Sequence, residues 1–491
     1  MDHWYDRKEG AIVEPDIQVL SDEEVLGRFS YRGELKRTLG LFASFAVAFS
    51  FISITTGIFT NFSFVLSTGG PAGIWTWPIA AIGQLFVAAV FADLASRIPI
   101  SGYSYQWIRR LTTPGVGWFT GWMSFAFLAL VVPAVDSGLA PIVAQVFGIA
   151  PTAAHLTDIV IVTILVQLLL NVFSVKATSG INSAAVFTEA GGFLGLTIVL
   201  AILAFVHHPH WSDLAYHANV KGSYVGPFVL SLLMGLFTIV GFEAAANLSE
   251  ETKQAHRVVP RAIVTSVALA GALGTLFLVA AVISIPNVGK AIASSAPLPY
   301  IIDSNLGSVF GTLFLVLVII SIFACGLVIM TSGGRLIFAM SRDGNFFASG
   351  LFRRVSPRFE TPVAALILLA LLSIVGAYFS SSLTVLVGTT AVLPALIYLF
   401  TTVTYLLSYR RLPAALASTR WARWGRPIAV IASIWLVFSV LVLTIPQQFH
   451  QVAIWTVGIL VLGLVVYFAG FRRRNLASAS SDLELPTGTS I

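Results

Sequence analysis

The feature that most constrains this chain is a succession of long apolar blocks, each near the ~20 residues that span a bilayer. The blocks are hydrophobic all round rather than alternating, which favours helices over a β-barrel. Only 10% of the 491 residues are charged, against about 25% in soluble domains, so the soluble classes are excluded. The sequence predicts an all-α polytopic membrane protein with twelve transmembrane helices, at 39–66, 74–96, 117–148, 156–174, 182–206, 226–249, 261–285, 306–334, 362–379, 383–407, 427–445 and 450–470.

The basic residues test this count and orient the chain. With both termini in the cytoplasm, all of the 28 Lys and Arg residues except Lys221 and Lys290 fall in inner segments. Such a bias is the positive-inside signal, and a misplaced span would break it. We therefore expect a multi-pass protein of a plasma or bacterial inner membrane, with a cytoplasmic N-terminal segment (1–38) and a cytoplasmic tail (471–491). This bias explains the net charge of +6 as a feature of membrane topology, so no nucleic-acid partner is expected.

Two blocks are interrupted midway by small and polar residues. The first contains Ser53-Ile54-Thr55-Thr56-Gly57, and the sixth contains Phe237-Thr238-Ile239-Val240-Gly241-Phe242-Glu243. Glycine loosens a helix, and hydroxyls can satisfy the freed backbone. Breaks in the first and sixth helices are expected of two five-helix inverted repeats, here 39–206 and, after an outer loop, within 207–407, with helices 11 and 12 in 408–470. Ordinary helix packing is the alternative, but the matched pair favours a site.

An unwound helix offers amide N–H groups at one half-helix start, which suit a carboxylate, and carbonyls at the other, which suit an ammonium. A zwitterion with both groups is therefore a natural guest of such breaks. The substrate would be held at the bilayer midplane between the two unwound segments.

Ionisable side chains within spans are costly, so each is a functional candidate. Asp136, Glu189 and Glu243 are such residues, and a carboxyl placed there can carry a proton. For Asp136 a satisfied buried acid is an equal alternative. We expect Asp93 to be a structural partner of Arg97.

The eighth span and the outer loop add weaker candidates. Thr331 and Ser332 are either sodium ligands that face the first break or polar packing residues. Cys325, the single cysteine, excludes an internal disulfide and is expected to be an inert small hydrophobe. We expect no metal and no cofactor, because the histidines of 207–210 lack acidic or Cys partners.

Three separated motifs resemble the amino acid–polyamine–organocation superfamily of permeases. They are GFEAAANLSEETK at 241–253, continuing to 263; GRLIFAMSRDG at 334–344; and LASRIP at 94–99 with Ser101, Gly102, Tyr103 and Trp107. The resemblance covers about residues 35–470. It implies a leucine-transporter-like inverted-repeat fold and alternating access of a small amine-containing solute.

The resemblance also implies roles for residues of this sequence. The substrate carboxylate would be held by Ser53, Ile54, Thr55, Thr56 and Gly57, and the amine by Phe237, Thr238 and Ile239, with Phe237 as gate. Many proton-coupled members carry a lysine in helix 5, where this chain has Glu189. That departure resembles the amino acid/choline branch. It makes Glu189 a candidate proton site or sodium neighbour.

These features together predict an amino acid importer. The coupling ion is expected to be the proton, with Na⁺ as the alternative. Within transport, the rivals are a choline, polyamine or ethanolamine carrier and an amino acid exchanger. A transporter-like amino acid sensor is expected to carry a long cytoplasmic domain. An enzyme is disfavoured, because none of the eight histidines lies at a span centre and no HExxH motif is present. Oligomeric state stays open.

Overall fold

The computed structural model describes residues 24, 27, 37–173, 175–217, 223–294, 296–379, 382–413 and 422–472. The predicted cytoplasmic segments 1–38 and 471–491 lie almost wholly outside the described residues. Within the described ranges the chain is helical, and its β-structure is an isolated bridge between Leu39 and Thr252. The predicted all-α polytopic fold is confirmed.

Ten helical segments of the described chain are long and apolar enough to cross a membrane, and two further apolar segments, Val225–Thr238 and Val363–Tyr378, are shorter. They coincide with the twelve predicted blocks, so the count of twelve depends on the two short ones. The spanning elements are α2 (Leu41–Ile52), α3 (Ile54–Thr68), α4 (Thr76–Arg97), α6 (Pro114–Phe147), α7 (Ala153–Phe173), α8 (Val175–Val206), α9 (Val225–Leu230), α10 (Leu232–Thr238), α12 (Ala255–Ile283), α14 (Pro297–Arg342), α16 (Val363–Phe379), α17 (Leu383–Leu407), α18 (Gly425–Thr444) and α19 (His450–Val466).

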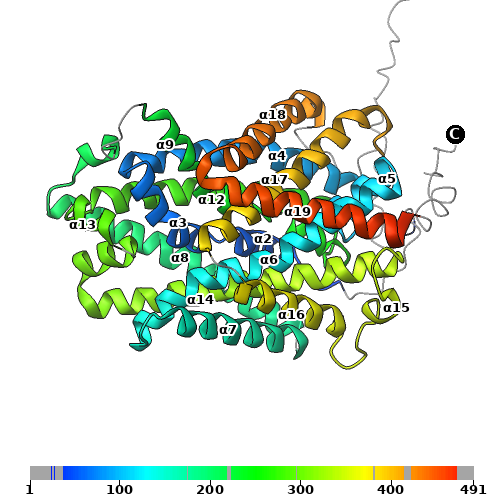
Figure 1. Cartoon of the computed structure of the whole chain (residues 1–491), viewed down its shortest axis with the longest axis horizontal. Helices are drawn as coiled ribbons and strands as arrows, with labels where there is room; N and C mark the ends of the chain where they lie inside the picture. The colour runs from blue at the N-terminus through cyan, green and yellow to red at the C-terminus, as the bar shows by residue number, and fades with distance from the viewer. Residues whose placement is uncertain are drawn as a thin grey trace, which may run out of the picture.

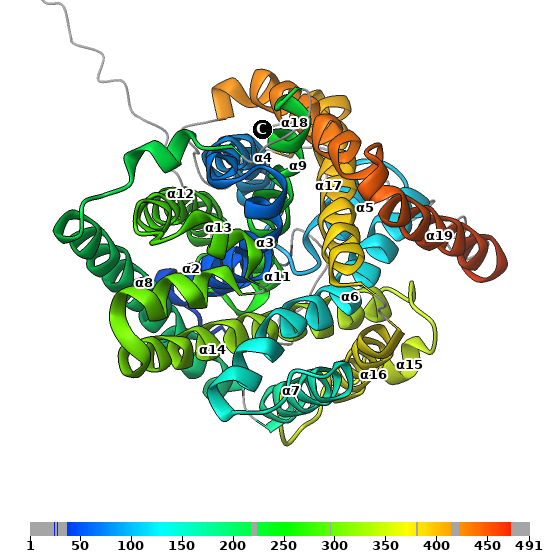
Figure 2. The same ribbon diagram turned by 60° about the vertical axis from the view of Figure 1, so that its left-hand side comes forward.

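The long helices lie side by side along the horizontal axis of Figure 1, with α2 and α3 in the middle of the bundle. Four elements pack around α2, namely α8, α12, α14 and the short α11 (Ala244–Asn247), and α3 packs against α10, α14 and α6. Figure 2 shows the same arrangement with α7 and α16 on one flank and α18 and α4 on the other. The first helix therefore lies inside the bundle, enclosed by other helices of the described chain.

Two short elements mark one end of the bundle, which we call the inner end. They are α5 (Tyr103–Leu111) and α15 (Ser349–Phe352), at the right of Figure 1. This end holds the loops that the positive-inside pattern assigns to the cytoplasm. The opposite end holds α9 and α13 (Val288–Ala293).

Both predicted helix breaks are present. The first lies between α2 and α3 at Ser53, whose φ of 36° and ψ of 92° are not helical. The sixth helix stops at Thr238 and resumes at Ala244, and Gly241 between them has a φ of 79°. A positive φ favours glycine, so the sequence of the sixth break matches its backbone. The predicted discontinuity of helices one and six is confirmed.

Candidate substrate and ion site at the helix breaks

The two breaks pack directly on each other, and a glycine makes each contact possible. A Cβ at Gly57 of α3 would lie 1.7 Å from the Thr238 hydroxyl oxygen at the end of α10. A Cβ at Gly241 would lie 1.8 Å from Cδ1 of Phe51 in the last turn of α2. Neither position can accept a side chain without movement of its neighbour. The structure therefore brings the predicted substrate residues of the two helices together.

The helix 1 break contains an anion of the chain itself. Oε1 of Glu189, from α8, accepts a hydrogen bond from the Ser53 hydroxyl (3.0 Å) and another from the Thr55 backbone N–H (3.2 Å). Ser53 Oγ in turn accepts the Thr56 N–H at 3.3 Å. The start of α3 is the positive end of a helix dipole, where a carboxylate is favoured. Glu189 thus occupies donors that the sequence assigns to a substrate.

A small hollow opens beside Glu189 between α3, α8 and α14. Its polar members are Thr55, Thr188, Glu189 and Ser321, and the rest of its lining is apolar: Gly192, Phe193, Phe314, Leu317 and Val318. The hydroxyl of Ser321 on α14 was not predicted from the sequence, which pointed to Thr331 and Ser332 on the same helix. The hollow thus places the Ser321 hydroxyl of α14, with those of Thr55 and Thr188, in one lining with a single carboxylate, Glu189.

The helix 6 break is held by α17. The Gly241 N–H donates to the Tyr398 hydroxyl at 2.8 Å, and that hydroxyl donates to the carboxylate of Glu243. The rings of Phe91 and Phe242 lie 4.9 and 5.2 Å from the Tyr398 ring. Tyr398 was not singled out from the sequence, where it sits in a featureless apolar block. It fixes the unwound backbone and the Glu243 side chain together.

The other predicted substrate residues are buried at this junction. Ile54, Thr55, Phe237, Thr238 and Ile239 are each less than 5% exposed. The Thr238 hydroxyl donates back to the Met234 carbonyl at 2.5 Å, within its own helix. Phe237, the predicted gate, lies in the apolar core at the end of α10. A solute would have to part α3 from α10 to reach these residues.

Three predicted ion-coupling residues make no hydrogen bond to the helix 1 break in the described chain. Asp136 of α6 is fully buried, with Oδ1 accepting the Gln167 side-chain N–H of α7 at 3.0 Å; its Oδ2 has no partner among the described residues. One alternative placed Thr331 at the helix 1 break as a sodium ligand. Its hydroxyl instead donates to the Leu327 carbonyl (2.9 Å) and to the side chain of Asn171 on α7. Ser332 is buried, and its hydroxyl has no hydrogen-bond partner in the described chain.

Two expectations about single residues have clear outcomes. Arg97 Nε lies 2.9 Å from Asp93 Oδ2, as predicted, and Tyr405 of α17 donates to the same oxygen at 2.8 Å. Cys325 is buried, as expected of a small hydrophobe, and its thiol also lies 3.4 Å from the Phe51 carbonyl at the end of α2. The cysteine therefore adjoins the helix 1 break.

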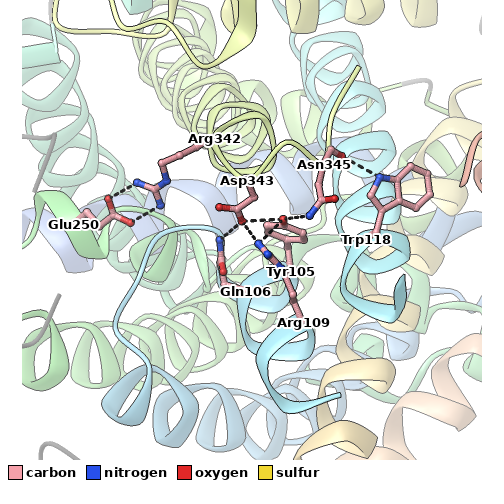
Figure 3. A network of polar contacts seen from close by, with 8 residues as sticks. All are labelled: Tyr105, Gln106, Arg109, Trp118, Glu250, Arg342, Asp343 and Asn345. Carbon is pink, nitrogen blue, oxygen red and sulfur yellow. Dashed lines mark hydrogen bonds and ion pairs between the residues drawn. The ribbon is translucent and has the colours of Figure 1, made fainter. Parts of the chain in front are cut away.

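The three sequence motifs meet at the inner end in a network of ion pairs (Figure 3). The Arg342 guanidinium donates to both oxygens of Glu250, each at 3.1 Å, and Glu250 Oε1 also accepts the Ser101 N–H at 3.2 Å. Beside it, Arg335 Nε donates to Glu251 at 3.0 Å. Residues 250–251 follow the helix 6 break, so this network ties the sixth helix to the end of α14.

A second cluster of the same network surrounds Asp343 (Figure 3). Asp343 Oδ2 accepts from Tyr105 (2.9 Å) and Gln106 (2.8 Å) of α5, and Arg109 Nη1 lies 2.6 Å away. Burial, and then the nearby Asp343 charge, raise the pKa of Tyr105 well above its ordinary value. Its phenol is therefore neutral and can donate. The cluster fastens the loop after α4 to the end of α14.

The start of the first helix joins this closure through backbone bonds. The Leu39 N–H donates to the Glu251 carbonyl at 3.0 Å, and the Lys253 N–H donates to the Leu39 carbonyl at 2.9 Å. Both broken helices therefore end in one connected assembly at the inner end.

Comparison with known proteins decides the family. The profile of the amino acid permease family matches residues 39–468, most of the chain. The chain belongs to this family. It is 29% identical over 394 residues to the amino-acid permease BAT1 of Arabidopsis thaliana, covering 73% of this chain and 75% of that one. It is 25% identical to the GABA-specific permease of Saccharomyces cerevisiae, covering 71% of this chain and 64% of that one.

A third relative is also named an amino-acid permease. The amino-acid permease 2 of Neurospora crassa is 23% identical, over 72% of this chain and 69% of its own. The resemblance that the three motifs indicated is thus confirmed. As a permease, the chain is a membrane transporter rather than an enzyme.

Proposed function

We propose that this permease imports an amino acid or a related amino compound by secondary active transport, coupled to the proton. The observation that carries the proposal is the Glu189 carboxylate at the helix 1 break, bonded to Ser53 and Thr55. An ionisable group buried in a span is expected to serve transport, and a carboxyl at the substrate site can carry a proton with the solute. Sodium is the alternative coupling ion.

The same geometry supports alternating access as the mode of transport. The halves of the two broken helices meet at Gly57 and Thr238, and their inner ends are joined through Leu39 and residues 250–253. Parting the network of Figure 3 would open a path from the breaks to the inner end. Opening of α3 and α10 at the opposite end would admit the solute. Such rocking around a midplane site is expected of two inverted repeats.

A related amine carrier is the second candidate, because three intramembrane carboxyls are present without a basic residue at mid-span. Choline, ethanolamine or a polyamine would use the acids and gain little from the amides of α3. The GABA-specific relative places γ-aminobutyrate among the solutes to be tried.

The test is uptake into proteoliposomes under an inward proton gradient and then a sodium gradient. The solutes are the twenty common amino acids, γ-aminobutyrate, choline and putrescine, each radiolabelled. Accumulation of an amino acid or γ-aminobutyrate that collapses with a protonophore is the expected result. Uptake of choline or putrescine alone would replace the proposal by the amine carrier. Saturable binding without flux would indicate a sensor, and accumulation only with sodium would replace the coupling ion.

A further inference from the structure

Most donors at the start of α3 are already used within the chain, and of its four first-turn N–H groups that of Ile54 alone has no hydrogen-bond partner among the described residues. The first-turn N–H of Thr55 donates to Glu189, and that of Thr56 donates to Ser53 Oγ. The Gly57 N–H makes a helical bond to the Ser53 carbonyl at 3.1 Å, and the Ser53 hydroxyl donates to Glu189. A carboxylate arriving from outside that binds this turn through more than the Ile54 N–H would need the same two donors that hold Glu189.

We propose that Glu189 is a tethered competitor of the substrate: the substrate carboxylate displaces the Glu189 carboxylate from Ser53 and Thr55, and the displaced Glu189 takes up one proton. This inference rests on the proposed function and gives its coupling a physical cause. The proton comes from water on the side from which the solute enters. It converts the carboxylate of Glu189 to the carboxylic acid, with no other bond made or broken.

The surroundings of Glu189 explain why displacement requires a proton. Away from the two donors the side chain faces the hollow, whose lining is mostly Gly192, Phe193, Leu317 and other apolar groups. An ionised carboxylate there would lose its bonds to the Ser53 hydroxyl and the Thr55 N–H, could keep only the hydroxyls of the lining, and would lie beside the incoming carboxylate. Two carboxylates that share one site do not readily stay ionised together. The Ser321 hydroxyl in the same lining offers an acceptor for a protonated Glu189.

No cation of the described chain is placed to neutralise the displaced carboxylate instead. The helices packed on α8 are α2, α7, α12 and α14. On α14 the titratable neighbour of Glu189 is the Cys325 thiol. Arg335 lies 14 residues beyond Ser321, about 21 Å along the helix, and Asp303 lies 11 residues before Phe314, on the far side of the kink at Gly307. The helices α2 and α3 carry no charged side chain.

The remaining neighbours are distant as well. Phe277 marks the part of α12 that lies beside the hollow, because its ring centroid is 4.2 Å from that of Phe193 in the lining. The basic residues His256, Arg257 and Arg261 lie at least 16 residues away from Phe277, about 24 Å along that helix. On α7 the titratable residues are His155 and Asp158 in its first two turns. A proton is therefore the charge that can accompany the exchange.

The sign of the coupling follows. Because binding of a carboxylate-bearing solute takes up a proton, its affinity rises as pH falls, by up to about tenfold per pH unit. Reciprocally, bound substrate strengthens proton binding by the same factor. Release of substrate at the inner end lets Glu189 return to Ser53 and Thr55 and lose its proton. An amine without a carboxylate leaves Glu189 in place and binds without proton uptake.

The experiment uses the full chain in detergent and a tritiated mixture of the common amino acids with γ-aminobutyrate. Saturable binding is measured between pH 5.5 and pH 8.5, and proton uptake on binding is followed with a pH-indicator dye in weak buffer. The test variant is Glu189→Gln, with Glu189→Ala as a second in case the first folds poorly. The matched control is Asp136→Asn, another fully buried carboxyl. Putrescine serves as the carboxylate-free probe.

We expect wild type and the Asp136→Asn variant to bind more tightly at low pH and to take up about one proton per solute. Both Glu189 variants should bind with an affinity near the wild-type low-pH value at every pH, without proton uptake. Absence of any saturable binding by wild type would overturn the proposed function itself. Binding without pH dependence, or proton uptake that survives in the Glu189 variants, would overturn the competition alone.

Discussion

Arg342 holds both carboxylate oxygens of Glu250, from Nη1 to Oε2 and from Nη2 to Oε1, each at 3.1 Å. The pair joins the end of α14 to the segment after the helix 6 break, and Glu250 is 1% exposed. Bidentate pairs of this kind are strong and directional, because two charge-assisted hydrogen bonds share one geometry. In the proposed transport cycle, opening at the inner end would have to break this pair.

Arg342→Lys should therefore favour opening at the inner end. A lysine keeps the charge but cannot make the paired bonds, a loss of about 1.5 kcal/mol that corresponds to about tenfold in the open population. Opening can be followed through the accessibility of Cys325, because this residue is the single cysteine and is buried beside Phe51. Its rate of alkylation by N-ethylmaleimide should rise about tenfold. The exposed Arg353→Lys is the control, and equal rates in both variants would contradict the assignment.

Gly57→Ala should abolish uptake and lower the melting temperature, because its Cβ would lie 1.7 Å from the Thr238 hydroxyl. Overpacking of this kind costs about 1–3 kcal/mol. Gly195→Ala of α8 is the matched control, since a Cβ there meets nothing within 4 Å. It should be neutral or stabilise by up to about 1 kcal/mol. Normal uptake by Gly57→Ala would show that the two breaks need not touch in the working cycle.

Tyr398→Phe should destabilise the helix 6 break without changing the packing of the ring. It removes the acceptor of the Gly241 N–H and the donor to Glu243, and an unsatisfied buried polar group costs about 1–3 kcal/mol. We expect a lower melting temperature in detergent and weaker substrate binding. Glu243→Gln retains an acceptor for the tyrosine and should cost less. If Glu243→Gln is the more damaging change, the carboxyl has a role beyond holding Tyr398.

How far the sequence predicts this site is shown by Glu189 and the hydroxyls of α14. Apolar blocks and their Ser, Thr and Gly interruptions are local features, so the spans and both breaks can be predicted. The contact of Glu189 with Ser53 joins residues 136 apart and depends on how α8 is rotated. A helix that is apolar all round carries no pattern that fixes its rotation.

The same limit explains why Ser321 was overlooked in favour of Thr331. The two residues are ten apart on α14, about 15 Å along the axis, and they lie on different faces. Thr331 contacts α7, whereas Ser321 lines the hollow with Glu189. Tyr398 was missed for a related reason. Its role depends on its hydrogen bond with Gly241 in the break of the sixth helix, a contact that the sequence of α17 does not reveal.

Asp136→Asn separates a structural acid from a coupling acid. One oxygen of Asp136 is bonded to Gln167, the other has no partner in the described region, and no ion pair to it is present there. Asparagine keeps a bond to Gln167 and removes the cost of a buried carboxyl without a cation, so the variant should melt at the same or a higher temperature. Uptake should be retained. Loss of proton-driven accumulation in a well-folded variant would instead make Asp136 part of the coupling.

Alkaline pH should loosen the Asp343 cluster through Tyr105. Burial and the Asp343 charge raise the pKa of Tyr105 above its ordinary value of 10.0. The unfolded chain therefore loses this proton first. The stability contributed by the neutral phenol is complete below about pH 10 and declines as the pH rises toward the folded-state pKa.

Melting temperatures of wild type and Tyr105→Phe between about pH 8 and pH 11 test this linkage. The variant lacks the donor to Asp343, so its free energy of unfolding at pH 8 should be lower by about 1.5–3 kcal/mol, the contribution of a hydrogen bond to a charged group. Its melting temperature at pH 8 should be lower accordingly. Because it has no phenol to titrate at this position, its melting temperature should fall less steeply above pH 10, and the two curves should converge. The control is Tyr378→Phe, an exposed tyrosine outside the network, whose curve should run parallel to wild type. Parallel curves for wild type and Tyr105→Phe would mean that Tyr105 does not titrate differently in the folded chain.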